Sequence, residues 1–228
     1  MAIGWLVPIF LSSLASLLLA GAILLKRSRG PVEKALVAVL VTTAWIQAGH
    51  VLEILDPTRT LMWKQLAMVG EIMFPVILYK VGASFVVEHH PDNISESRWR
   101  FQALWILGLL CTAILLASTF FPSADLLPLW VPPGKVISLF ILVALVAALA
   151  QLEQVLRASR DPLRYQIKFV IIGLGSLAGF AILQSTQLDI FLHGNTGYVF
   201  AEGIITLLSI ALTGYGLRRW YFHDMSSA

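Results

Sequence analysis

Apolar runs dominate this chain, and short polar segments separate them. A helix needs about 20 consecutive apolar residues to cross the hydrocarbon core of a bilayer, and seven runs here are long enough. Only 13% of the 228 residues are charged, against about 25% in soluble domains, and the mean hydropathy is +0.82. A soluble core of this length cannot bury so much apolar surface. The sequence therefore predicts an all-α polytopic membrane protein, a seven-transmembrane helix bundle.

The expected spans all belong to one domain that covers residues 1–228. They are 3–25, 35–55, 61–87, 101–121, 135–156, 166–192 and 198–217. No basic residue precedes the first run, so we expect a retained helix rather than a cleaved signal peptide. Two longer connections are predicted: a polar loop at Glu88–Arg100 and an apolar, proline-rich link at Pro122–Gly134.

The basic residues predict the orientation, because Lys and Arg concentrate on the cytoplasmic side of membrane proteins. With the N-terminus outside, 13 of the 16 fall on cytoplasmic segments. Those 13 are Lys26, Arg27, Arg29, Lys34, Lys80, Arg98, Arg100, Arg157, Arg160, Arg164, Lys168, Arg218 and Arg219. The outer segments hold only Arg59, Lys64 and Lys135. We therefore predict an outer N-terminus and a cytoplasmic C-terminus.

Polar side chains gather in the predicted outer half of the bundle and form the candidate ligand or signal pocket. They are Gln47, His50, Glu53, Glu71, Gln184, Gln187 and Glu202. The first three are spaced by three residues, which keeps them on one side of a helix. Glu71 lies near the middle of its span, where an ionised and unpaired carboxylate is costly. We therefore expect Glu71 to face the bundle interior.

Two interpretations of this polar group stay open from the sequence. Ionisable residues inside a membrane mark functional sites by default, which favours a pocket that detects a ligand or a proton. Hydrogen bonds between polar side chains also hold helices together, which favours a structural role. His50 and Glu53 alone supply too few ligands to predict a metal site.

Several classes of function have no support in the sequence. It contains no glycine-rich phosphate loop and no HExxH motif, and no cofactor is predicted. A retinal protein needs a lysine in its seventh helix, and none lies between Tyr198 and Leu217. No basic face free of lipid is expected, which argues against nucleic acid as a partner. The single Cys111 excludes an intramolecular disulfide.

A basic turn between the fifth and sixth spans surrounds Asp161 and Pro162, and the last span ends in a second basic segment. We interpret both as cytoplasmic anchors that could carry an output signal. Their residues are Arg157, Arg160, Arg164, Lys168, Arg218 and Arg219. Beyond the turn, Gly175 and Gly179 form a GxxxG pattern, which predicts close helix packing within the bundle rather than a dimer seam.

The region around this turn resembles a known family. Glu153, Arg157 and Arg164, the run Ile167–Phe169 and the run Gly173–Gly175 are similar to the membrane domain of PrsK-type sensor histidine kinases, which accompany the PEP-CTERM/exosortase system of bacteria. The resemblance implies a two-component signal-input domain in the bacterial inner membrane, with cytoplasmic kinase modules in the same full-length protein. This chain shows neither a phosphoacceptor region nor an ATP-binding domain, so we expect no catalysis from it.

Two functional hypotheses follow. The first is a membrane-embedded sensory domain, with the polar pocket as detector and the last helix as output. The alternative is a scaffold or accessory subunit of a larger membrane complex. A small transporter has less support, because no internal repeat or broken helix is visible. The bilayer is the predicted partner, and the sequence leaves a homodimer open.

Overall fold

The computed structural model describes residues 3–25, 30–89, 94–120, 133–159, 163–188 and 196–226. Within these residues the chain is helical, with one 3-10 turn (η1, Pro57–Arg59) and no strand. The helices are α1 (Ile3–Leu24), α2 (Pro31–Leu55), α3 (Thr60–His89), α4 (Ile94–Phe120), α5 (Pro133–Ala158), α6 (Leu163–Leu188) and α7 (Thr196–Ser226). All seven are long and apolar enough to cross a membrane, which confirms the predicted class of fold.

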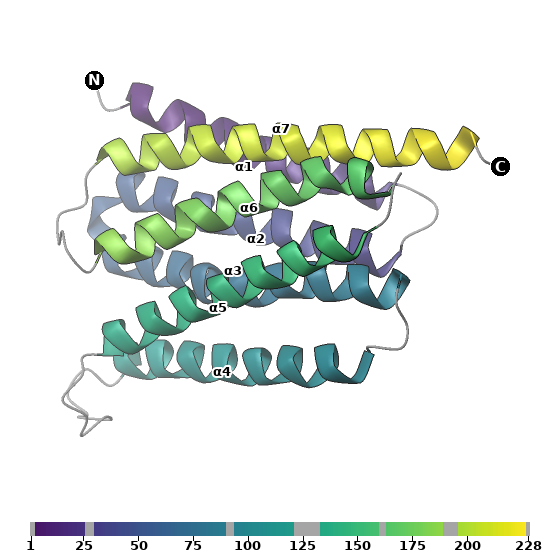
Figure 1. Ribbon diagram of the computed structural model, residues 1–228. Coiled ribbons are helices and arrows are strands. Elements are labelled where there is room, and N and C mark those ends of the chain that lie inside the picture. The colour runs from purple at the N-terminus through teal and green to yellow at the C-terminus, as the bar shows by residue number, and fades with distance from the viewer. Residues whose placement is uncertain are drawn as a thin grey trace.

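Six of the helices form a closed ring, in which each helix packs against two neighbours. The order around the ring is α1, α2, α3, α5, α6 and α7, and α7 returns to α1. α4 stays outside this ring and packs only against α3 and α5 at its edge (Figure 1). The two termini lie at opposite ends of the bundle, as an odd number of crossings requires (Figure 1). The arrangement leaves an interior that α2, α3, α5, α6 and α7 share.

The start of α2 shows how local sequence chemistry moves a predicted boundary. The helix begins at Pro31, four residues before the expected Ala35. Proline is favoured at the first helical position, since its missing N–H has no partner there anyway. The N–H of Gly30 donates to the Glu33 carboxylate at 2.9 Å, which satisfies one backbone donor at the helix entry.

The predicted polar loop at Glu88–Arg100 is wrong in large part. α3 continues to His89 and α4 already begins at Ile94. α7 likewise runs nine residues past the predicted Leu217, to Ser226, and extends beyond the neighbouring helix ends (Figure 1). Charged residues mark where a helix leaves the bilayer, but the helix itself continues wherever its backbone stays hydrogen-bonded in water.

Other predicted connections lie largely outside the described residues. α5 ends at Ala158 and α6 begins at Leu163, so the described helices flank the basic turn, and Arg160 lies outside the description. Most of the Pro122–Gly134 link also lies outside it, although Pro133 and Gly134 open α5. α6 ends at Leu188, before the expected Leu192.

Glycines permit close helix contacts, but not where the GxxxG pattern predicted them. A Cβ atom at Gly179 would meet nothing within 4 Å, and one at Gly175 only the tip of Leu149 at 3.9 Å. A Cβ at Gly173 would instead lie 2.7 Å from the Ser209 carbonyl oxygen of α7. The pattern identified the correct helix and the wrong face, because spacing alone does not show which side of an apolar helix turns inward.

Candidate functional site

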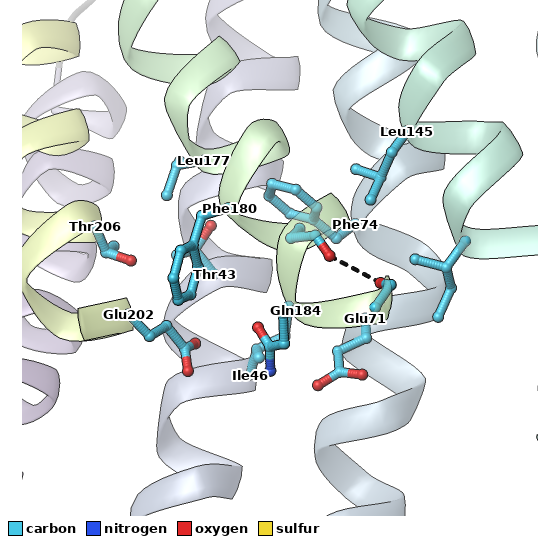
Figure 2. A pocket seen from close by; sticks show the side chains of 13 residues that line it. Thr43, Ile46, Glu71, Phe74, Leu145, Leu177, Phe180, Gln184, Glu202 and Thr206 are labelled. Atoms are coloured by element: carbon cyan, nitrogen blue, oxygen red, sulfur yellow. Dashed lines mark hydrogen bonds between the residues drawn. The ribbon is translucent and has the colours of Figure 1, made fainter. Parts of the chain in front are cut away.

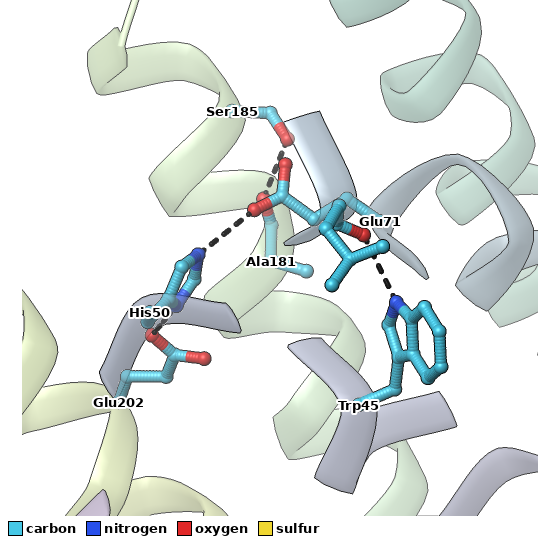
Figure 3. A network of polar contacts seen from close by, with 7 residues as sticks. Trp45, His50, Glu71, Ala181, Ser185 and Glu202 are labelled. Carbon is cyan, nitrogen blue, oxygen red and sulfur yellow. Dashed lines mark hydrogen bonds and ion pairs between the residues drawn. The ribbon is translucent and has the colours of Figure 1, made fainter. Parts of the chain in front are cut away.

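His50 of α2 joins two carboxylates across the ring interior. Its Nδ1 lies 3.0 Å from Glu202 Oε2 on α7, and its Nε2 lies 3.2 Å from Glu71 Oε1 on α3 (Figure 3). The His50 side chain is only 12% exposed, and Glu202 is 11% exposed. α2 and α7 are not neighbours in the ring. The contact between His50 and Glu202 therefore links two helices that do not pack directly against each other. We call His50, Glu71 and Glu202 the interior triad.

The geometry of the triad sets the smallest number of protons that it can hold. A neutral imidazole has one donor and one acceptor nitrogen, and an ionised carboxylate only accepts. Contact at both nitrogens therefore requires two shared protons: either an imidazolium between two carboxylates, or a neutral imidazole with one protonated carboxyl. Both states carry a net charge of −1. Loss of one proton places a lone pair of the ring against a carboxylate, which breaks one of the two contacts.

A small pocket adjoins the triad and encloses about 60 Å³. A buried water needs roughly 10–15 Å³ of such space, so the pocket has room for a few waters or a similarly small ligand. Glu71, Glu202 and Gln184 lie together at one end of it, while Thr43, Phe74 and other mainly apolar side chains line the rest (Figure 2). The full lining is Thr43, Ile46, Glu71, Phe74, Ile141, Leu145, Leu177, Phe180, Ala181, Gln184, Ser185, Glu202 and Thr206.

The triad and the polar end of the pocket lie toward the same end of the bundle as the N-terminus. His50 is five residues before the end of α2, and Glu202 is six residues after the start of α7. At 1.5 Å per residue these positions are about 8 and 9 Å from their helix ends. Glu71 lies deeper along α3, yet its side chain reaches His50. The sequence-based prediction that Glu71 faces the bundle interior is confirmed.

A polar stripe on α7 extends from the triad into the bundle, and sequence reasoning missed it. Glu202, Thr206, Ser209 and Thr213 are all buried. Their spacing of four, three and four residues is typical of one helix face, and this period was available in the sequence. Ser209 Oγ lies 2.6 Å from Ser176 Oγ on α6, which adds a polar link between α6 and α7. Glu202, the member of the triad that α7 contributes, lies on this same face. A change at Glu202 therefore acts on a helix that the Ser209–Ser176 contact already links to α6.

Gln47 lies one turn from His50 on α2 and is fully buried. Neither its amide nitrogen nor its amide oxygen has a hydrogen-bond partner among the described residues. A buried amide without partners costs free energy of folding, of the order of 1–3 kcal/mol. The sequence placed Gln47 on the correct face, but the structure does not bring it into the triad.

The other predicted pocket residues have different outcomes. Gln184 lines the pocket beside Glu71 and Glu202 (Figure 2). Glu53 is half-buried and makes no hydrogen bond or ion pair with the other described residues, so it does not join the network. Gln187 is on α6 one residue before its end, and its side chain is not described. Among the described residues, no group of three His, Cys, Asp or Glu side chains is arranged to hold a metal ion.

The predicted cytoplasmic anchors that the structure describes lie at the opposite end of the bundle, and Arg160 is outside the described residues. Arg157 pairs with Glu153 on the same helix, with Nε to Oε1 at 3.0 Å, and both side chains are well exposed. Lys168 lies with its ammonium 5.8 Å from the centroid of Phe169. Arg218 and Arg219 are exposed on α7. Arg164 is on the first turn of α6, where its side chain is not described.

The turn between α2 and α3 is held by Asp56 at the end nearest the triad. Its Oδ1 accepts from the Thr58 N–H at 3.2 Å and from the Thr58 hydroxyl, and its Oδ2 accepts from Trp63 Nε1 at 3.3 Å. The side-chain hydrogen bond from Thr58 lowers the pKa of the Asp56 carboxyl, with a further contribution from Trp63. On the adjoining helices, Trp45 Nε1 donates to the Leu66 carbonyl at 2.9 Å (Figure 3).

No protein-family model, curated protein sequence or solved structure matches this chain. The resemblance to PrsK-type kinases therefore stays a prediction, carried only by the residues around the basic turn. What the structure establishes is an all-helical chain with seven helices, within its described residues, that are long and apolar enough to cross a membrane.

Proposed function

We propose that this chain is a membrane-embedded signal-input domain that responds to the proton occupancy of the interior triad. The observation that carries the proposal is the position of His50, in contact with carboxylates from two other helices inside the ring. Since both contacts need two shared protons, the loss of one proton releases either Glu71 or Glu202. A change in proton occupancy thus becomes a change in how α2, α3 and α7 are connected.

The detecting end and the output end of α7 are far apart on one continuous helix. Glu202 is near the start of α7, and the helix continues without a break to Ser226. α7 also extends past its neighbours at the end opposite the triad (Figure 1). A rigid helix transmits a shift at one end to the other. The resemblance to PrsK-type kinases favours a cytoplasmic kinase module as the receiver of that shift, in the bacterial inner membrane.

The surroundings of His50 contain few other titratable groups. Glu71 of α3 and Glu202 of α7 face it directly. α6 contributes the uncharged Gln184 and Ser185 to the adjoining pocket, and α5 contributes only apolar side chains. α1 carries no titratable side chain within Ile3–Leu24, and α2 itself adds Glu53 one turn away. Glu53→Gln therefore serves as the control that separates the triad from the next titratable side chain on α2.

Spin labels at the opposite end of the bundle test this function. In a Cys111→Ala background, Ala158→Cys on α5 and Ser226→Cys on α7 report how far the end of α7 lies from α5. We expect the distance distribution, measured by pulsed electron spin resonance in lipid nanodiscs, to change when the pH is varied over the range in which the chain stays folded. His50→Gln removes this change, while the matched control Glu53→Gln keeps it. A distribution that is constant over this pH range contradicts the proposal.

The second candidate, a scaffold subunit, is favoured by the close packing of α7 on its neighbours. A Cβ atom at Gly203 would lie 2.5 Å from the Ile9 nitrogen of α1, and the Ser176–Ser209 contact ties α7 to α6. In a scaffold the triad is a static link that only stabilises the bundle. His50→Gln then lowers thermal stability, and the two spin labels report one distance at every pH.

A further inference from the structure

A second cavity lies on the outer surface of the bundle, at the end opposite the triad. It measures about 400 Å³ and is formed by one face of α4, one face of α5 and Tyr79 of α3. Its lining is Tyr79, Trp99, Arg100, Ala103, Leu104, Leu107, Ala147, Ala150, Gln151 and Gln154. This volume is within the range of roughly 300–1,000 Å³ typical of small-molecule sites. We call it the α4–α5 groove.

The groove follows from the sequence of both helices. α4 and α5 each present residues at i, i+3, i+4 and i+7, which form a single face. Small side chains stand at the positions where larger ones would fill the space, namely Ala103, Ala147 and Ala150. α4 is outside the ring, and α4 and α5 diverge toward the end where α4 begins (Figure 1). The groove is therefore built into the fold and opens toward the lipid.

Exposure shows which side of the groove is the floor and which is the rim. Tyr79 and Gln151 are buried, at 4% and 7% exposed, and form the floor. A Cβ atom at Gly82 would lie 2.7 Å from Gln151 Cγ, so Gly82 is what allows Gln151 to lie flat against α3. Leu107 and Ala150 are exposed on the rim, facing the surrounding bilayer.

The mouth of the groove is cationic and lies at the membrane boundary. The α4 span begins at Trp99, with Arg100 next to it. The Arg100 guanidinium carbon lies 5.8 Å from the centroid of the Trp99 ring, a contact that keeps the charge at the mouth of the groove. Tryptophan and arginine at this depth are typical of the headgroup region.

We propose that the α4–α5 groove binds one anionic phospholipid. Its phosphate lies at Arg100, and one acyl chain lies along the alanines and leucines between α4 and α5. An arginine fork matches a phosphate oxygen pair, and Gln154 adds an amide donor beside it. A lipid suits this site better than a partner helix, because the groove combines an apolar, alanine-lined length with a single cationic end at headgroup depth. This proposal is independent of the role of the triad.

Native mass spectrometry of the purified chain with defined lipids tests the proposal. Phosphatidylglycerol and phosphatidylcholine with the same acyl chains are compared. We expect one tightly bound phosphatidylglycerol per chain and weaker binding of phosphatidylcholine. We expect Arg100→Gln to lower the affinity for phosphatidylglycerol by about tenfold or more, which corresponds to the loss of a hydrogen bond to a charged group. Lys80→Gln is the matched control, since Lys80 is a basic residue at the same end that packs over Phe101 and does not line the groove.

A second variant tests the acyl chain separately from the headgroup. Ala150→Phe fills the groove from its exposed rim without entering the core, so we expect it to weaken both lipids. Equal affinity for the two lipids, or no effect of Arg100→Gln, overturns the proposal. Displacement of the lipid by glycerol phosphate alone overturns it in favour of a phosphate site. Dimers that Ala150→Phe dissociates, without bound lipid, overturn it in favour of a contact between copies.

Discussion

His50 and Glu202 are 3.0 Å apart, although they belong to helices that do not pack against each other. α1 separates α2 from α7 around the ring, and the two side chains span the interior between them. Glu71 completes the bridge from α3. An ionisable link of this kind is expensive inside a membrane, and its geometry depends on the number of protons it holds.

Gly203 and Gly179 form a matched pair for the packing of α7 and α6. A Cβ at Gly203 would lie 2.5 Å from the Ile9 nitrogen, so Gly203→Ala forces α1 and α7 apart. We expect a loss of about 1–3 kcal/mol in unfolding free energy, the usual cost of overpacking. Gly179→Ala meets no atom within 4 Å and leaves stability unchanged or slightly higher, because alanine favours a helix. Unfolding in mixed micelles measures both variants, and equal losses contradict the ring packing.

Gln47 destabilises the bundle as it stands. Gln47→Met removes two buried polar atoms that have no partner among the described residues and keeps a similar volume. We expect the unfolding free energy to rise by about 1 kcal/mol. Gln184→Met is the control, since Gln184 is only half-buried and lines the pocket. A stability loss for Gln47→Met that exceeds the loss for Gln184→Met contradicts this interpretation.

Asp56 gives the turn between α2 and α3 a pH-dependent stability. Hydrogen bonds from Thr58 and Trp63 lower the pKa of Asp56 in the folded state. A depressed pKa stabilises the fold above the unfolded value of about 3.9, and this contribution is lost as the pH falls through the folded value. We therefore expect Asp56→Ala to lower the melting temperature at pH 7 and to converge with the wild type in strong acid. Thr58→Ala, which removes one donor, reproduces part of the effect. If the melting temperatures of the wild type and Asp56→Ala differ by the same amount down to the lowest pH, this prediction is wrong.

The predicted orientation of the chain in the membrane rests on the uneven distribution of Lys and Arg between the two sides. Labelling of introduced cysteines tests it. In a Cys111→Ala background, Ser95→Cys and Ser159→Cys are labelled in intact cells with a membrane-impermeant thiol reagent. Both positions belong to segments predicted to be cytoplasmic, so we expect labelling only after the membrane is opened. Labelling of either cysteine from the outside reverses the predicted topology.

The sequence predicted the number of helices well, because each long apolar run has only one stable form in a bilayer. It also placed Gln47 and His50 on one inward face, since three-residue spacing leaves little choice. It left open whether His50 meets Glu71, because depth counted along each helix ignores tilt and side-chain reach. The position of α4 outside the ring was not predicted either, because residues 101–120 carry no charged side chain and no polar period that marks an inward face.

Some residues of the site were predicted from the sequence, and others were recognised only from the structure. Glu202 was predicted as a member of the candidate pocket, whereas Thr206, Ser209 and Thr213 on the same helix were not considered. Their spacing already placed them on the face of Glu202, and their common burial shows that this face turns inward. Glu53 shows the opposite error, because a favourable spacing placed it beside His50 while the helix leaves it outside the triad.

A double-mutant cycle on the position of α7 tests the central claim most directly. The distance between labels at Ala158→Cys and Ser226→Cys is measured at one pH for the wild type, His50→Gln, Glu202→Gln and the double variant. If the His50–Glu202 contact sets the position of α7, each single variant shifts the distance to the same new value and the double variant adds nothing. If all four proteins give one distance and differ only in thermal stability, the contact is a static link and the signal-input account is wrong.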